Sequence, residues 1–335
     1  MKKNLILILL ALGLLMTILV TLTIGPVHIP VGIVIKVLFS KIVSIPQTWQ
    51  DNFQEIILNV RLPRILLGVF AGCALSISGC TMQALFRNPM ASPYVCGVAS
   101  GGAFGASLII VLGISQVLVM PVAFFFSLLT VFLVYHLAKV GRKIPVETLL
   151  LSGIALSLFF SALTSFIQYM AKEEELRQII FWLMGGLWAS NWNKVLSVFP
   201  VILLGILCLL YFSRELNILL LGEEQALDVG VEVEGTRKII LILTALITAS
   251  AVATCGIIGF VGLVIPHIMR IIIGPDHRFL LLASAISGSI FLVWVDTFAR
   301  ILISPTELPV GIITALIGVP FFLFLLRRRK RLSGF

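Results

Sequence analysis

Apolar runs of about 20 residues recur along the whole chain, and they constrain its fold more than any other feature. Each run is long enough, or nearly so, to cross a hydrocarbon layer about 30 Å thick as a helix that rises about 1.5 Å per residue. The run at 258–272 is short and contains Pro266, so it can be broken or only partly inserted. The sequence predicts about ten spans, at 4–25, 64–86, 93–114, 117–138, 146–170, 195–213, 238–257, 258–272, 279–299 and 309–326.

The composition places these runs in a lipid bilayer. Of the 335 residues, 59% are hydrophobic and only 12% are charged, whereas soluble domains carry about 25% charged residues. No soluble domain or linker interrupts the pattern, so we expect one all-α, polytopic membrane domain over 1–335. The five cysteines lie in apolar stretches without Cys-x-x-Cys spacing, which predicts packing thiols and neither disulfides nor a metal site.

The distribution of basic residues predicts the orientation. With both termini in the cytoplasm, most of the 24 Lys and Arg residues lie inside, including Arg87, Arg142 and the tail at 327–331. This bias accounts for the +9 net charge without nucleic acid. The first run follows two lysines, as in a signal peptide, but it is longer than a signal core of about 7–15 residues. We therefore expect an uncleaved first span.

Two segments between spans have their own character. In the long segment 26–60, "VGIVIKVLFSKI" is compatible with a short interfacial helix. The segment 171–194 is expected to be irregular, and its tryptophans suit the interface between water and lipid.

Three arginines lie outside against this bias: Arg61, Arg64 and Arg300. They are either snorkelling side chains at the interface or a docking surface, because the guanidinium fork pairs bidentately with carboxylates. Asp296 stands one turn before Arg300. It can act as a proton relay or as an (i, i+4) partner of Arg300, and we favour the pair.

Small residues recur every four positions in the second span, at Gly68, Gly72, Ser76 and Cys80. Such a stripe allows close helix packing, and lining a transport pathway is the alternative. Catalytic motifs are missing from the sequence: there is no P-loop, no His-Glu-x-x-His and no Gly-x-Ser-x-Gly. We therefore expect no catalytic residue, no metal site and no ATP site in this chain.

Acidic residues concentrate in the largest predicted inside loop, "LGEEQALDVGVEVEGTRK" at 221–238. A short helix ending near Gly230 is plausible there. The loop is either a solvated segment or a docking helix for a cytoplasmic partner. Its candidate residues are Glu223, Glu224, Ala226, Asp228 and Gly230.

Four segments carry a resemblance to a known family. They are "RLPR" followed by "GCTMQALFRNPMASPYVCGVASGGAFGA", then "GEEQALDVGV", then "GIIGFVGLVIPHIMRIIIGPDHR", and "DTFARILISPTELPVGIITALIGVPFF". In order and content the chain resembles the FecCD-type permeases, the membrane subunits of ABC importers for iron–siderophore complexes, haem and vitamin B12. Segment 26–60 carries no such likeness.

The resemblance implies ten helices in a homodimer or a pair of related permeases. Two cytoplasmic ATPase subunits, which hold ATP and magnesium, would bind on one side, and a solute-binding protein would dock on the other. Arg61, Arg64 and Arg300 match the family's docking arginines. The 221–238 loop matches its ATPase-coupling loop, although Gln225 departs from the Glu-Ala-Ala-x-x-x-Gly signature of importer permeases.

The resemblance predicts an importer permease of a bacterial or archaeal cell membrane, with a ferric siderophore as the first choice of cargo, followed by haem, cobalamin and oxyanions. The alternative is a secondary transporter or channel without an ATPase, which the scarcity of charge within the spans disfavours. A membrane enzyme is remote because no catalytic constellation occurs.

Overall fold

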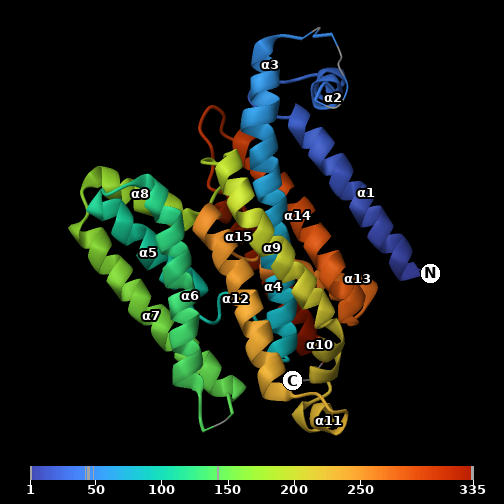
Figure 1. The fold of residues 1–335 in the computed structure, drawn as a ribbon, viewed down its shortest axis with the longest axis vertical. Coiled ribbons are helices and arrows are strands. Elements are labelled where there is room, and N and C mark those ends of the chain that lie inside the picture. The colour runs from blue at the N-terminus through green and yellow to red at the C-terminus, as the bar shows by residue number, and fades with distance from the viewer. Residues whose placement is uncertain (1, 42, 44–45, 48, 142, 333–335) are drawn as a thin grey trace.

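The computed structural model describes residues 2–41, 43, 46, 47, 49–141 and 143–332, with side chains omitted at 325, 326 and 328–332. Arg142 and most side chains of the basic tail therefore lie outside the described part. The described residues form a bundle of helices (Figure 1). The elements are α1 (Lys2–Thr23), α2 (Val31–Phe39), α3 (Asp51–Glu55), η1 (Ile56–Arg61), α4 (Leu62–Leu85), α5 (Val98–Leu112), η2 (Gln116–Leu118), α6 (Val119–Ala138), α7 (Val146–Met170), α8 (Glu173–Met184), α9 (Trp192–Tyr211), α10 (Ser213–Leu219), α11 (Glu223–Asp228), α12 (Val233–Cys255), α13 (Val261–Ile273), α14 (His277–Ile301) and α15 (Val310–Leu332).

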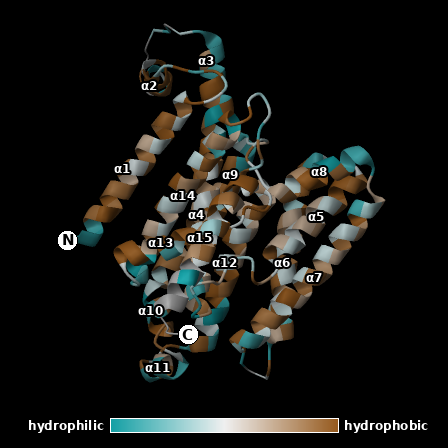
Figure 2. Ribbon diagram, turned by 180° about the vertical axis from the view of Figure 1, so that it is seen from behind, coloured by the Kyte–Doolittle hydropathy of each residue, from teal (hydrophilic) through white to brown (hydrophobic). Residues whose placement is uncertain are grey.

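The protein is a polytopic membrane protein, as the apolar runs predict. Seven helices in the described ranges are long and apolar enough to cross a membrane, and three shorter apolar helices, α5, α13 and the Val310–Phe324 part of α15, complete the ten expected positions. Figure 2 shows apolar residues along most of these helices and polar residues at the two ends. We call these the α2–α3 end and the α11 end, after the elements that stand there (Figure 1).

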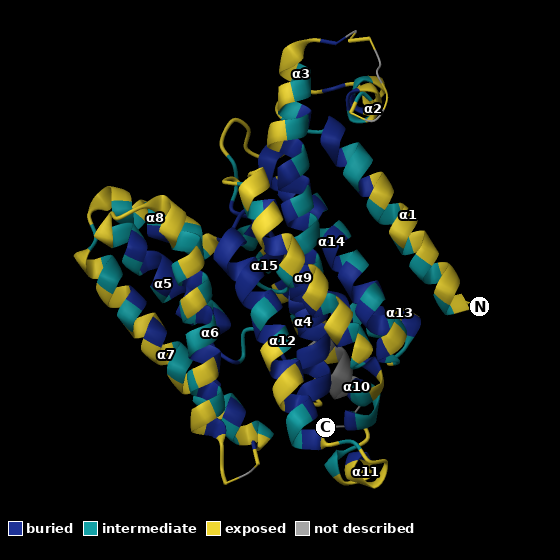
Figure 3. Cartoon of the chain, viewed as in Figure 1, coloured by how far each residue is buried: buried dark blue, intermediate teal, exposed yellow. Residues whose placement is uncertain are grey.

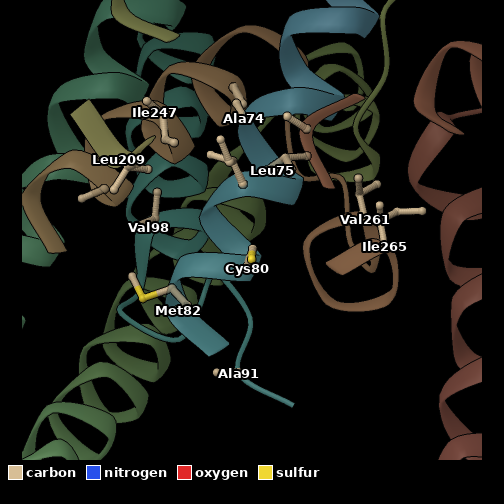
Figure 4. Packing of buried hydrophobic residues seen from close by; sticks show 14 of the residues in the cluster. Ala74, Leu75, Cys80, Met82, Ala91, Val98, Leu209, Ile247, Val261 and Ile265 are labelled. Atoms are coloured by element: carbon tan, nitrogen blue, oxygen red, sulfur yellow. The ribbon is translucent and has the colours of Figure 1, made fainter. Parts of the chain in front are cut away.

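The helices form a buried centre and an exposed periphery. The apolar parts of α4, α12 and α14 are mostly buried, whereas few residues in those of α1 and α7 are buried, and Figure 3 shows the same contrast. Apolar side chains on the exposed faces, such as Leu5 and Leu158, suit contact with lipid. The centre packs Leu75, Cys80 and Val261 in one cluster with side chains from the neighbouring helices (Figure 4).

The small-residue stripe of α4 lies against α14. A Cβ atom on Gly72 would overlap the carbonyl oxygen of Gly288, and one on Gly288 would overlap the Ser76 hydroxyl. A Cβ atom on Gly68 would come within 3.1 Å of Leu187 and 3.3 Å of Val293. The stripe therefore lets two backbones approach closely, which the membrane requires because lipid supplies no hydrophobic driving force between helices.

The region around Pro266 is a short unbroken helix preceded by irregular backbone. α13 has 13 residues, which corresponds to about 20 Å and spans only part of a bilayer. Residues 256–260 before it are not helical. The Tyr94 hydroxyl donates to the Ile258 carbonyl at 2.7 Å, so this polar backbone has a partner inside the protein. Irregular backbone at membrane depth is tolerated only under such conditions.

Two segments contain more helix than the sequence predicts. The expected short helix in 26–60 is α2, but residues 51–61 also form α3 and η1, which extend α4 beyond its apolar span. The segment 171–194, expected to be irregular, contains the helix α8, so that expectation is wrong. The acidic first turn of α8 (Glu173–Glu175) favours helix there.

Candidate functional sites at the two ends of the bundle

At the α2–α3 end, Arg64 joins three segments of the chain. Its Nε lies 3.0 and 3.1 Å from the two oxygens of Asp296, and its Nη2 lies 2.8 Å from Oδ1. Its Nη1 donates to Oε1 of Glu307 at 2.9 Å. α4, the end of α14 and the loop before α15 are thus held together by one guanidinium, whose five donors suit such a role.

Arg300 completes the same cluster. Its Nε lies 3.2 Å from Oδ2 of Asp296, which is the expected (i, i+4) pair, and its Nη2 donates to the Thr297 hydroxyl at 3.1 Å. Asp296 therefore serves two arginines while only 2% of its surface is exposed. A buried carboxylate with two cationic partners satisfies the rule that buried charges are paired.

The guanidinium of Arg61 bonds to backbone carbonyl groups and not to carboxylates. Its Nη1 donates to the Leu22 carbonyl at 2.6 Å, and its Nη2 donates to the Val27 carbonyl. A Cβ atom on Gly25 would come within 2.7 Å of the same guanidinium, so glycine makes room for it. Arg61, the last residue of η1, thereby holds the end of α1 and the connection to α2 against η1.

All three predicted docking arginines are buried, at 4%, 7% and 4% exposure for Arg61, Arg64 and Arg300. Each is bonded within the chain, so none presents a free guanidinium to water in this conformation. The exposed acid of the group is Glu307, whose side chain is 33% accessible. Docking by these arginines stays a prediction, and it would require contacts at Glu307 or nearby to change.

At the α11 end, the loop 221–238 contains the short helix that the sequence suggests. Gly230 has a φ of +83°, its N–H donates to the Leu227 carbonyl at 2.9 Å, and the Val231 N–H donates to the Ala226 carbonyl at 2.9 Å. This pair of bonds is the Schellman motif, which glycine at the C′ position favours. The backbone therefore ends α11 sharply before α12 begins.

Arg237 on α12 fixes α11 and the neighbouring loop. Its Nη2 donates to Glu223 at 2.5 Å, and its Nη1 lies 3.1 Å from the Ile144 carbonyl and 3.3 Å from Glu234. The hydrogen bond from Arg237 lowers the pKa of Glu223 below its ordinary value. Arg237 is buried, whereas the Glu223 side chain is 44% exposed.

The rest of α11 is turned outward. Ala226 is fully buried, but Leu227 and Val229 are 61% and 60% exposed, and Glu224 and Asp228 are exposed as well. Exposed leucine and valine beside acids on a projecting helix form a surface that another protein can cover. α11 thus contacts its own chain through buried Ala226 and through Glu223, and it keeps an open face.

α10 is attached to the start of α14. Asn217 donates to Asp276 at 2.9 Å and accepts from the His277 backbone N–H at 2.8 Å. Arg278 also donates to Asp276, and this bond holds the pKa of the carboxyl well below its usual range. Movement of α10 would therefore be transmitted to α14, the helix that carries Asp296 at its other end.

Comparison with known proteins identifies the family. The model of the FecCD transport family matches residues 13–328. The chain belongs to this family. It is 48% identical to the cobalamin import system permease protein of Halobacterium salinarum, over 84% of this chain and 75% of that protein. It is 41% identical to the hemin transport system permease protein of Yersinia pestis, over 85% and 87%.

A solved structure shares the whole fold. It is described as a metal-chelate type ABC transporter in an inward-facing conformation, and it is similar with a TM-score of 0.85 and 38% identity over 96% of this chain and 99% of that chain. This likeness in fold agrees with the membership of the chain in the FecCD family.

Several residues of these clusters were not singled out from sequence. They are Arg237, Asn217, Asp276 and Glu307. Arg237 stands at the polar start of an apolar run, where it resembles an ordinary topology charge. The signal for Glu307 is its place in "SPTELP", a turn next to the predicted arginines, but no sequence rule pairs it with Arg64.

Proposed function

We propose that this chain is the membrane permease subunit of an ABC importer that carries a metal chelate into the cytoplasm. The observation that carries the proposal is the likeness over nearly the full chain to a metal-chelate type ABC transporter. The cobalamin and hemin permeases among the relatives support a chelate as the class of cargo. Within that class, a ferric siderophore is our first choice.

The orientation proposed from basic residues places both termini and the α11 end in the cytoplasm. Two partner ATPase subunits would bind there and hold the ATP and magnesium, since the sequence carries no P-loop. A second copy of this chain, or a related permease, would complete the pathway. The α2–α3 end would face outward and receive the solute-binding protein.

α11 is the proposed contact with the ATPase. Its outward leucine, valine and acids would contact the ATPase, and its Glu223 is bonded to Arg237 on α12, so a displacement of α11 would move α12. A displacement of α10 would move α14 through the bond between Asn217 and Asp276. Such coupling requires that the nucleotide-bound and nucleotide-free ATPase favour different positions of these helices.

The proposed docking of the binding protein uses Arg64 and Arg300. Because these arginines are buried and share Asp296, reversing their charges would disturb the bundle as well as any docking. A partner glutamate would instead replace Glu307 at Nη1 of Arg64, because the Glu307 side chain is partly exposed.

Reconstitution tests the function. The chain with its ATPase and binding protein in liposomes should accumulate a ferric siderophore only with ATP, and haem, cobalamin and molybdate serve as competing cargoes. Uptake that persists without the ATPase would favour the secondary-transporter alternative.

Two variants test the role of α11. Glu224→Lys and Gly230→Val should leave the bundle assembled but reduce the ATP hydrolysis that cargo-loaded binding protein stimulates. Glu173→Lys, an equal charge reversal on exposed α8 at the other end, is the control. Normal stimulation in both α11 variants would remove α11 from the mechanism.

A further inference from the structure

A cavity of about 450 Å³ opens between the group α5–α8 and the central helices. Its walls come from the ends of α5, α6, α9 and α12 and from α8. It lies toward the α2–α3 end, because the first residue of α9, Trp192, donates its indole N–H to the Leu58 carbonyl of η1 at 3.0 Å. None of the arginines described at either end of the bundle lines it.

The cavity combines apolar walls with two cations. Ile110, Val119, Met120 and Ala253 line it from the helix ends, together with the indole rings of Trp182 and Trp188. Lys194 and Arg177 also line it, and the acid among the described lining residues is Glu174, which lies 3.5 Å from the Gln178 amide. The charged lining is therefore positive on balance.

Lys194 is the group that most needs an explanation. It stands in the first turn of α9, where its backbone N–H is capped by Asn191 at 2.9 Å. A cation is disfavoured at this end of a helix, because the macrodipole is positive there. Across the described part of the chain, neither its ammonium nor the Arg177 guanidinium has a hydrogen bond or an ion pair to another group.

The shape of the cavity is held by backbone contacts. The Gly186 N–H donates to the Cys255 carbonyl at 2.7 Å. Gly185 has a φ of +66°, and a Cβ atom there would overlap the Ile257 carbonyl oxygen. Trp188 packs edge-on against Phe181 with ring centroids 5.9 Å apart. These contacts fix the backbone and the aromatic rings that line the cavity.

We propose that this cavity binds the head region of an anionic phospholipid from the membrane leaflet at the α2–α3 end. The phosphodiester would lie between Lys194 and Arg177, and the first part of an acyl chain would cover Ile110 and Val119. A small inorganic anion would satisfy the cations but leave the apolar walls in water. Tryptophans at the rim suit the level of lipid head groups.

Native mass spectrometry of the full chain in its transporter complex tests this site. After exchange into phosphatidylglycerol, the wild type should retain one tightly bound lipid per chain. Phosphatidylcholine has the same phosphodiester but places a choline cation near Lys194 and Arg177, so it should bind on the order of ten-fold more weakly. Lys194→Gln should lose the retained phosphatidylglycerol, and Lys194→Arg should keep it. Lys172→Gln, a matched change on an exposed residue that does not line the cavity, should also keep it.

Three results would overturn the proposal. The first is equal retention of phosphatidylglycerol by Lys194→Gln and the wild type. The second is complete displacement of the lipid by millimolar inorganic phosphate, which would make the site one for free anions. The third is an equal loss of thermal stability by Lys194→Gln in phosphatidylglycerol and phosphatidylcholine, which would assign the lysine to the neighbouring C-terminus of α12 instead of to a lipid.

Discussion

Each end of the bundle buries an arginine that is paired with carboxylates, and the two ends differ in how far those carboxylates are exposed to water. At the α2–α3 end, Arg64 and Arg300 share Asp296, and all three side chains are less than 10% exposed on long helices. At the α11 end, Arg237 is 5% exposed, but its partners Glu223 and Glu234 are 44% and 29% exposed.

The difference means that the Asp296 cluster holds its helices firmly, whereas the contacts of Arg237 with its carboxylates can be broken more easily. Removing one partner of a buried pair leaves an uncompensated charge in low dielectric, which is costly, whereas pairs open to water are weak and screened by salt. α11 has six residues, too few to form a stable helix alone. Its position therefore depends on contacts that water and a partner protein can replace.

Asp296→Asn should have the largest effect, because it leaves Arg64 and Arg300 without their shared charge. We expect about 3–5 kcal/mol less stability, the cost of breaking a buried pair, measured by denaturant unfolding of the purified protein. Asp51→Asn, on an exposed residue of α3, should change stability little. A loss below about 1 kcal/mol would mean that the two ends do not differ as described.

Arg237→Gln should loosen α11 without unfolding the bundle. Glu223 is then free to enter water, so hydrogen exchange over 221–231 should become faster while global stability falls by only about 1–3 kcal/mol. Lys238→Gln, a change on the exposed neighbour, should leave exchange in this segment as it is. Unchanged exchange in Arg237→Gln would show that α11 is held by apolar packing alone.

Glu307→Gln should cost about 1 kcal/mol or less, because the acid is partly exposed and Asp296 still holds Arg64. It also replaces the charged acceptor at Nη1 of Arg64 with a weaker amide oxygen, which a carboxylate from outside could displace. Under the docking proposal, the affinity for the binding protein should rise a few-fold, most clearly at low salt. An unchanged affinity would leave these arginines with a structural role only.

Acid should weaken the contact that holds α11. The pKa of Glu223 is lowered in the folded state, so its contact adds stability above the ordinary glutamate pKa, about 4.3. That stability is lost as the pH falls through the lowered folded pKa. Exchange over 221–231, corrected for intrinsic rates, should increase below about pH 4. Glu223→Gln should remove this dependence, and Asp228→Asn should retain it.

The positions of the long apolar helices could be predicted closely from sequence, whereas most partners in the charge clusters could not. The run at 146–170 is the helix Val146–Met170, because the length of apolar surface that a bilayer covers is a local property of the chain. The helix before Gly230 is local too, since glycine alone supplies the positive φ of its end at little cost. α8 was missed because its apolar residues do not form a spanning run.

The partners of the arginines required the tertiary structure. The pairing of Asp296 with Arg300 follows from helical spacing, but Arg64 is 232 residues from Asp296, and an arginine at a helix end can equally face water. The sequence places the three arginines at the outer end, but it does not reveal the carbonyl groups and acids that other segments bring to them.

By itself, the sequence determined that this protein is a helical membrane bundle, where its long apolar helices lie along the chain, and, through its likeness to a family, the kind of transporter to which it belongs. Lipid makes these properties local, because each span must be apolar and must satisfy its own backbone hydrogen bonds. The tertiary structure alone decided which cations are buried, which acid each one meets, and where Lys194 stands in a cavity. Charge pairing depends on distances between segments far apart in the chain, and the bundle fixes those distances only when its small-residue contacts bring α4, α13 and α14 together.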